Sequence, residues 1–280
     1  MDHGKDRSVV QFHVHLVSDA TGETLSAVAT AACAQFELVR PIDHTYALVR
    51  SPRQLERALA EIEVAPGIVM FTLINPILRH RLEERCLQLG LPCIAILDPV
   101  IGALRSFLGT KEHLDKPGIQ HELDASYFRR IEALTFSMAH DDGQNMANLN
   151  EADVVLVGVS RTSKTPTCIY LANRGIKTAN VPIVPGVRLP SELEALDHPL
   201  VVGLTVSPER LVAIRRNRLA VMNQEDAETD YVDLEMVRAE MNAARRVFGI
   251  HGWPVIDVTR RSIEETAAAI LNLYQRPVEG

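Results

Sequence analysis

Short apolar runs alternate with longer segments of mixed polarity through the first third of the 280-residue chain. The apolar, β-branched runs predict strands, and the segments between them predict helices. Pro52 and Pro76 suit the first turn of a helix, where a missing N–H costs nothing. The predicted strands are residues 9–18, 42–49, 67–73 and 92–97, and the predicted helices are an Ala-rich segment that ends near residue 36 and residues 52–63 and 76–89. This alternation indicates a parallel sheet with helices on its faces.

A polar interval separates this region from a second one with the same alternation. It comprises a predicted helix at 100–108, a polar loop with a Pro-Gly turn at 109–123, and a predicted helix at 125–140. Further strands are predicted up to residue 158 and at 178–183, 200–205 and 254–258, and further helices at 165–174, 208–221, 234–248 and 263–274. We therefore expect an N-terminal parallel-sheet α/β domain (1–110), a linker and helix (111–150), and a C-terminal α/β domain (151–280).

The strand that ends at Gly158 leads into a polar loop at 160–163 and then Lys164-Thr165. Against the phosphate-loop pattern G-x-x-x-x-G-K-[ST], only Ser163 departs, because it occupies the second glycine position. In such a loop the backbone N–H groups surround phosphates, the lysine neutralises their oxygens, and the threonine hydroxyl holds Mg²⁺. Serine tolerates positive φ less readily than glycine, so some distortion is expected. The alternative is a turn capped by Ser and Thr, but the preceding strand and following helix favour phosphate binding and a P-loop kinase-like C-terminal domain.

Charged residues supply further candidates. Arg161 adds a second cation to the loop, which favours a polyanionic ligand. Asp141 and Asp142 could orient or deprotonate an acceptor hydroxyl, as could Asp19, although an exposed acidic turn is an alternative for them. Four arginines in the helix at 208–221 form either a solvated basic face or a clamp on a moving phosphate: Arg210, Arg215, Arg216 and Arg218.

Two polar groups near the N-terminus also have alternative interpretations. His13 and His15 would share one face of the first strand, and a structural pair is favoured over a metal site because no third ligand is suggested nearby. Residues 19–24 precede a helix, where small polar residues cap the first turn or bind an anion. Their spacing favours capping.

Composition narrows the classes of function. The net charge of -7 and the pI of about 5.8 argue against bulk nucleic-acid binding. The four cysteines form no C-x-x-C pair, which indicates free buried thiols in a reducing cytosol: Cys33, Cys86, Cys93 and Cys168. The first 15 residues lack the apolar core of a signal peptide, and no apolar run is long enough to span a membrane. We expect a soluble cytoplasmic protein without nucleic-acid or membrane partners.

Residues 158–185, GVSRTSKTPTCIYLANRGIKTANVPIVP, closely resemble the bacterial and plant pyruvate, phosphate dikinase regulatory proteins and the related phosphoenolpyruvate synthase regulatory proteins. Other matching stretches are LVSDATGET (16–24), YFRRIEAL (127–134), HDDG (140–143) and GLTVSPERL (203–211). The resemblance thus spans nearly the whole chain, and its motifs together are highly specific.

This resemblance implies a bifunctional enzyme. Family members are serine/threonine kinases that use ADP as phosphoryl donor, and they also remove the phosphate with inorganic phosphate and release pyrophosphate. Their acceptor is a Thr or Ser of the dikinase beside its catalytic His, and phosphorylation switches the dikinase off. The family's nucleotide loop corresponds here to Gly158, Val159, Ser160, Arg161, Thr162, Ser163, Lys164 and Thr165. Ser163 is a usual variant at its position.

The expected site therefore binds ADP, inorganic phosphate and Mg²⁺. Its catalytic candidates are Lys164, Arg161, Asp141 and Asp142, with Thr165 as the metal ligand. The expected partner is pyruvate, phosphate dikinase, because residues 109–128 look more like the dikinase branch than the synthase branch. A non-catalytic nucleotide sensor and a small-metabolite kinase are the rival functions. The sequence allows a homodimer and leaves the general base and the role of the N-terminal domain open.

Overall fold

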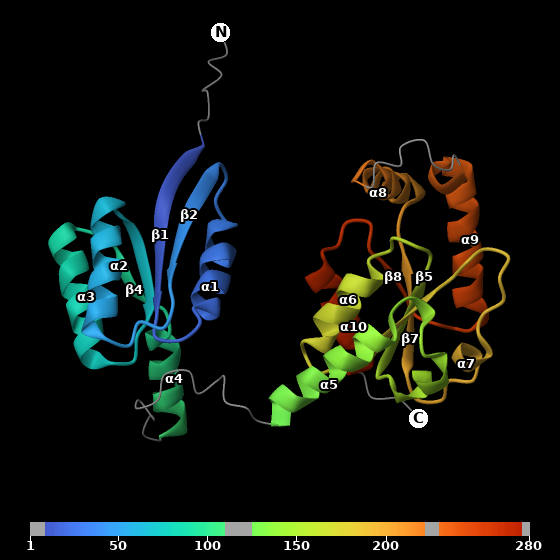
Figure 1. Ribbon diagram of the computed structural model, residues 1–280, viewed down its shortest axis with the longest axis horizontal. Coiled ribbons are helices and arrows are strands. Elements are labelled where there is room, and N and C mark those ends of the chain that lie inside the picture. Colours follow the sequence, from blue (N-terminus) through green and yellow to red (C-terminus); the bar gives the residue numbers. More distant parts are fainter. Residues whose placement is uncertain (1–8, 110–124, 222–229, 276–280) are drawn as a thin grey trace, which may run out of the picture. The chain divides into compact units, whose positions relative to one another are not determined.

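The computed structural model describes residues 9–109, 125–221 and 230–275. The chain divides into two compact units, Met1–Glu122 and Leu123–Gly280, and each is described here by itself (Figure 1). Most of the polar loop predicted at 109–123 lies outside the described residues.

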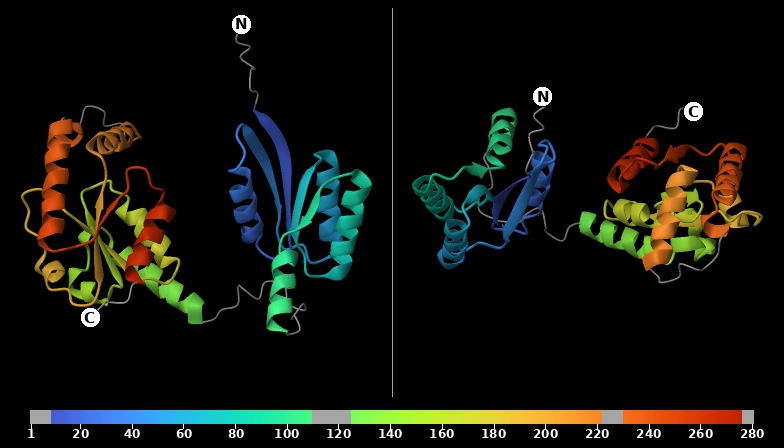
Figure 2. Two further views of the ribbon diagram at one scale, coloured as in Figure 1. Left: turned by 180° about the vertical axis from the view of Figure 1, so that it is seen from behind. Right: turned by 90° about the horizontal axis from the view of Figure 1, so that it is seen from above.

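The first unit is a four-stranded parallel sheet with helices on both faces (Figure 2). Its elements are β1 (Val10–Ser18), α1 (Glu23–Cys33), β2 (Val39–Tyr46), α2 (Pro52–Val64), β3 (Gly67–Thr72), α3 (Pro76–Leu89), β4 (Cys93–Ala95) and α4 (Asp98–Leu108). Side chains alternate between the faces of β1, so Leu16 packs with α1 whereas Val17 packs with α2 and α3. The central strand β3 is likewise apolar on both faces, as expected for a covered parallel sheet, whereas β2 is more polar and none of its residues is buried.

The second unit repeats this arrangement around a larger core. Its elements are α5 (Ala125–Ala139), η2 (Asp141–Gly143), η3 (Met146–Glu151), β5 (Val154–Gly158), α6 (Lys164–Ala172), β6 (Thr178–Pro182), α7 (Ser191–Glu194), β7 (Leu200–Thr205), α8 (Pro208–Val221), η4 (Asp230–Val232), α9 (Leu234–Ile250), β8 (Val255–Asp257) and α10 (Ile263–Tyr274). The sheet order is β6-β5-β7-β8, which matches the order β2-β1-β3-β4 of the first unit.

The predicted α/β class and the two parallel sheets are confirmed, with shifts at the ends of elements. The strand predicted at 42–49 is instead Val39–Tyr46, because Leu48 takes a left-handed conformation with φ 58° that no strand can continue through. The strand predicted at 92–97 is shortened to Cys93–Ala95, since α4 begins at Asp98.

Strand β5 fixes the position of the candidate site. All five of its residues are buried, and it lies between β6 and β7. After β5 the chain forms β6 on one side of β5 and then crosses to form β7 on the other side. The direction in which successive strands are added to the sheet therefore reverses between β5 and β7. Open parallel sheets bind ligands beyond the carboxyl ends of their strands at such a reversal, which is where the loop at 159–163 lies.

Candidate functional site

The loop after β5 depends on a close backbone approach at Gly158. A Cβ atom on Gly158 would lie 2.8 Å from the Leu204 carbonyl oxygen and 2.9 Å from Thr162 Oγ1. The Thr162 hydroxyl is buried and donates to the Val159 carbonyl at 2.9 Å, which closes the first part of the loop. Glycine is therefore the residue that lets β5, β7 and the loop come together.

Ser163 adopts the backbone conformation that the second glycine of the motif would adopt. Its φ is 60° and its ψ is 21°, in the left-handed region, and Arg161 also has a positive φ of 72°. Ser163 is the N-cap residue of α6, yet its side chain makes no capping hydrogen bond. The capped-turn alternative lacks its main support, because the N–H groups at this helix start have no side-chain cap and can meet an anion.

Lys164 is buried beside these N–H groups. Only 6% of the residue is exposed, and its Nζ donates to the Val159 carbonyl oxygen at 2.9 Å. Burial lowers the pKa of Lys164 to about 8, against the opposing influence of the Asp142, Cys168 and Asp141 charges. A phosphate placed here would supply the negative charge that the buried ammonium lacks.

Thr165, Asp141 and Asn180 form one hydrogen-bonded cluster next to Lys164. The Thr165 hydroxyl donates to Asp141 Oδ1 at 2.9 Å, and Asn180 Nδ2 donates to the same oxygen at 2.6 Å. Asn180 Nδ2 also contacts Thr165 Oγ1 at 3.1 Å. The sequence alone does not single out Asn180; the signal that it offers is an amide side chain within the strand predicted at 178–183, and the structure buries this side chain.

Asp142 differs from its neighbour Asp141. It is exposed, and its backbone is left-handed with a φ of 53°. No residue in the described part of the chain bonds to its carboxylate, whereas Asp141 is held by two donors. The Asp141 carboxylate is thus held in place by hydrogen bonds, whereas the Asp142 carboxylate is free to accept one from a ligand.

These side chains surround a hollow of about 580 Å³. Its lining residues are Asp141, Asp142, Ser160, Arg161, Ser163, Lys164, Thr165, Pro166, Asn180 and Ile214. The predicted catalytic residues therefore meet in one place, while Gly158, Val159 and Thr162 lie buried beneath it. This volume lies within the range of small-molecule and cofactor sites.

For Arg215 itself, both interpretations of the arginine-rich helix are wrong. It is 2% exposed, and its Nη2 pairs with Glu240 Oε2 of α9 at 2.6 Å. Arg215 also donates to the carbonyl oxygens of Tyr231 at 3.0 Å and Ser160 at 3.5 Å, and its guanidinium lies 4.4 Å from the centre of the Tyr231 ring. Arg215 is therefore an internal brace, that is, a buried side chain that links α8 to α9, to η4 and to the loop, and it is neither solvated nor free to bind phosphate. Arg210, Arg216 and Arg218, in contrast, are exposed.

The N-terminal candidates lie in the other unit. Asp19 is buried and accepts from the Ile74 N–H at 2.7 Å, and burial raises the pKa of its carboxyl group. Gly22 is the N-cap residue of α1 and carries no side chain, so it provides no side-chain cap there. The ring nitrogens of His13 and His44 are 2.8 Å apart. Among the described residues, no group of three or more His, Cys, Asp and Glu can hold a metal.

The cysteines are free among the described residues, but their burial differs from the prediction. Cys86 and Cys168 are buried, whereas Cys33 and Cys93 are half-buried. The prediction of four buried thiols is wrong for the latter two.

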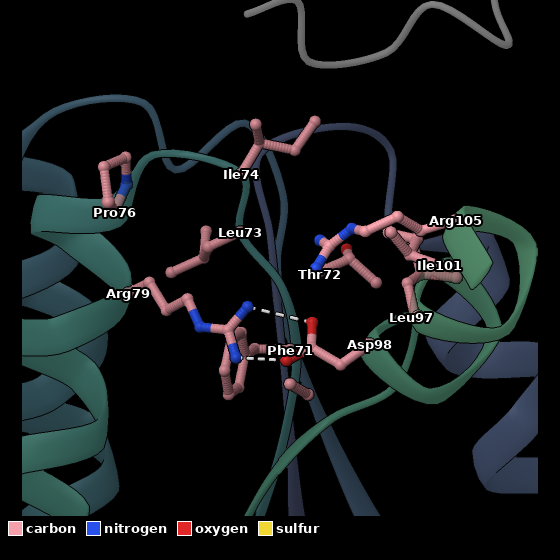
Figure 3. A pocket seen from close by; sticks show the side chains of 12 residues that line it. Phe71, Thr72, Leu73, Ile74, Pro76, Arg79, Leu97, Asp98, Ile101 and Arg105 are labelled. Carbon is pink, nitrogen blue, oxygen red and sulfur yellow. Dashed lines mark hydrogen bonds and ion pairs between the residues drawn. The ribbon is translucent and has the colours of Figure 1, made fainter. Parts of the chain in front are cut away.

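The first unit also contains a hollow, of about 350 Å³, at the carboxyl ends of β3 and β4 (Figure 3). A bidentate ion pair between Arg79 and Asp98 crosses it, and Arg105 points into it from α4. Asp98 is thereby held with its pKa below the usual range.

Comparison with known proteins gives the family. Residues 14–271 match the family model described as "Kinase/pyrophosphorylase". The chain belongs to the kinase/pyrophosphorylase family. It is 59% identical over 267 residues (95% of this chain, 84% of the relative) to a pyruvate, phosphate dikinase regulatory protein of Caulobacter vibrioides. Relatives with the same name occur in Paramagnetospirillum magneticum (56% over 276 residues, 99% of this chain and 88% of the relative) and Rhizorhabdus wittichii (58% over 265 residues, 95% and 96%).

Membership of the kinase/pyrophosphorylase family identifies the chain as a phosphotransferase. It also confirms the resemblance inferred from the loop and its accompanying motifs. No helix within the described residues combines the length and apolar character needed to cross a membrane.

Proposed function

We propose that the chain is an ADP-dependent serine/threonine protein kinase and a phosphate-dependent, pyrophosphate-forming phosphorylase that acts in the cytoplasm on a threonine of pyruvate, phosphate dikinase. The observation that carries this proposal is the convergence of buried Lys164, uncapped N–H groups and two aspartates on one hollow. The names of the relatives support the choice of the dikinase as acceptor.

ADP would bind with its phosphates against the start of α6. The loop N–H groups and Lys164 would bind the β-phosphoryl oxygens, and the Lys164 ammonium would exchange its contact with the Val159 carbonyl for a charged partner. Inorganic phosphate would bind to the same donors during phosphorolysis of the phosphorylated dikinase. Catalysis would rest mainly on positioning and on charges arranged in advance.

The side chains beside Lys164 fit a bound Mg²⁺. Thr165 Oγ1 and Asp141 Oδ1 are hard oxygen ligands that lie 2.9 Å apart, and Asn180 keeps the carboxylate in place through a 2.6 Å hydrogen bond. The ion would neutralise charge on the phosphates. We assign Thr165 and Asp141 as its protein ligands and Asn180 as the residue that positions them.

Asp142 is the better candidate for the general base. Its carboxylate lines the hollow and is exposed, and Asp141 is already engaged by two donors. In the kinase direction, the acceptor threonine oxygen bonds to the β-phosphorus, the bond from that phosphorus to the α,β-bridging oxygen breaks, and AMP leaves. The threonine proton passes to Asp142, and in phosphorolysis the same carboxylate would relay the proton of the attacking hydrogen phosphate to the threonine oxygen.

The test uses the full chain, purified dikinase and ADP labelled in its β-phosphate. Label should appear on a dikinase threonine with the wild-type chain and be absent with Lys164→Ala, and added inorganic phosphate should release the label as pyrophosphate. Transfer only to phosphoenolpyruvate synthase would identify the synthase as the partner. ADP binding without any transfer would identify a nucleotide sensor, and transfer from ATP to a free metabolite would identify a metabolite kinase.

A further inference from the structure

Helix α8 borders the hollow in a defined orientation. It begins three residues after β7 ends, and the loop follows β5 directly. Because β5 and β7 are parallel neighbours, both connections leave the same edge of the sheet, and Figure 1 shows α8 across that edge. Ile214 of α8 lines the hollow, and the next residue, Arg215, bonds to the loop carbonyl of Ser160.

Helical geometry then separates the exposed arginines of α8 into two groups. Arg210 and Arg218 are four residues before and after Ile214, which places each within about 40° of it around the helix axis. Arg216 is two residues from Ile214, and therefore about 200° away on the opposite side. Arg210 and Arg218 thus belong to the face that carries Ile214, and Arg216 does not.

The charges on this face are uncompensated. Within the described part of the chain, neither Arg161 of the loop nor Arg210 or Arg218 forms an ion pair, whereas Arg215 and Arg238 do. Arg218 in the last turn is favoured by the helix dipole, but Arg210 in the first turn is opposed by it. Among the described residues Arg210 has no ion-pair partner, and its place on the helix face that carries the hollow-lining Ile214 points to an anionic ligand.

We propose, on the basis of the proposed function, that Arg161, Arg210 and Arg218 bind the phosphate carried by the acceptor protein, as phosphothreonine. Guanidinium groups bind phosphate oxygens through paired hydrogen bonds and keep their charge at any working pH. Because Ile214 and Arg161 both line the hollow, these arginines meet the phosphate from the side where α8 borders it, while Lys164 and the loop N–H groups hold the donor phosphates.

This arrangement explains how two anions can meet in the phosphorolysis direction. An oxygen of hydrogen phosphate bonds to the phosphorus of phosphothreonine, the bond from that phosphorus to the threonine oxygen breaks, and the phosphate's proton goes to that oxygen. The products are threonine and pyrophosphate, with four negative charges retained. The three arginines would offset the repulsion between the reactants.

The first test measures binding to the full chain. A synthetic peptide that spans the acceptor threonine is made with phosphothreonine and with threonine, and both are titrated into the wild type, Arg210→Ala/Arg218→Ala and Arg216→Ala. We expect the wild type and Arg216→Ala to prefer the phosphopeptide at least 10-fold, and the double variant to lose this preference. The ADP affinity of both variants should stay within about 3-fold of the wild-type value.

The second test measures phosphorolysis of the phosphorylated dikinase. The KM for this substrate should be at least 10-fold higher in Arg210→Ala/Arg218→Ala than in the wild type. In Arg210→Lys/Arg218→Lys the KM should lie between these two values, because the positive charges are retained. The inference is overturned if the double variant keeps the phosphopeptide preference, if the wild type has none, or if ADP affinity falls equally. A wild type that prefers the phosphopeptide yet transfers no label would leave this inference standing and refute the proposed function.

Discussion

Replacing Arg215 with alanine should unfold the second unit at a markedly lower temperature. The substitution leaves the Glu240 carboxylate without its 2.6 Å partner and removes the donors to the Tyr231 and Ser160 carbonyls. Removing one member of a buried ion pair costs about 3–5 kcal/mol. Because the Glu240 side chain is 21% exposed, water recovers part of this, and we expect a loss of about 2–4 kcal/mol.

A loss of that size would lower the melting temperature by roughly 4–16 °C for a unit of this length. Calorimetry of the full chain measures it, with Arg216→Ala as the control because Arg216 is exposed on the same helix. Arg215→Met/Glu240→Leu should be less destabilised than Arg215→Ala, since no charge remains unpaired. Equal melting temperatures for Arg215→Ala and Arg216→Ala would refute the assignment of Arg215 as an internal brace.

Three other substitutions test the phosphate loop and the metal ligands. Gly158→Ala should destabilise the chain by about 1–3 kcal/mol in urea unfolding and weaken ADP binding in titration calorimetry, because its Cβ would lie 2.8 Å from the Leu204 carbonyl; unchanged values would contradict the close approach. Asn180→Ala should raise the Mg²⁺ concentration needed for half-maximal kinase activity about 10-fold or more, while unchanged Mg²⁺ dependence would show that Asn180 does not position Asp141. With a Lys164 pKa of about 8 in the free protein, the wild-type ADP affinity should fall as pH rises above 8, and Lys164→Met, which has no charge to lose, should bind weakly with no such fall. The pKa of Lys164 is lower in the folded than in the unfolded protein, so burial of its charge lowers the free energy of unfolding by the full amount below pH 8, and this loss disappears as pH rises toward 10.5. Without ADP, Lys164→Met should therefore be more stable than the wild type by a larger margin at pH 7 than at pH 10.

The sequence predicts the loop well because its signals are local. Gly158, Lys164 and Thr165 lie within eight residues, between an apolar strand and a helix, and these elements form where the pattern places them. Ser163 departs from the pattern, but its backbone takes the required left-handed conformation.

The remaining parts of the site depend on long-range pairing. Asn180 reaches Asp141 only because β6 lies beside the segment that contains η2, where the Asn180 N–H donates to the His140 carbonyl at 3.0 Å, and no local pattern reports this contact. Arg215 and Arg216 are adjacent and chemically identical in the sequence, yet one is buried against Glu240 and the other is exposed. The shared strand order of the two sheets was equally hidden, because order is set by packing and no repeat of residues accompanies it.

The buried pair between Arg215 and Glu240 also limits how the nucleotide can reach its site. A lid motion that swung α8 away from α9 and the loop would separate this pair, at a cost of about 2–4 kcal/mol after the partial exposure of Glu240 is taken into account. Such an open state would hold only about one molecule in 30–1,000. Ligand exchange should therefore proceed with α8 in place, so the spacing between the loop and the arginines of α8 stays nearly constant through the catalytic cycle.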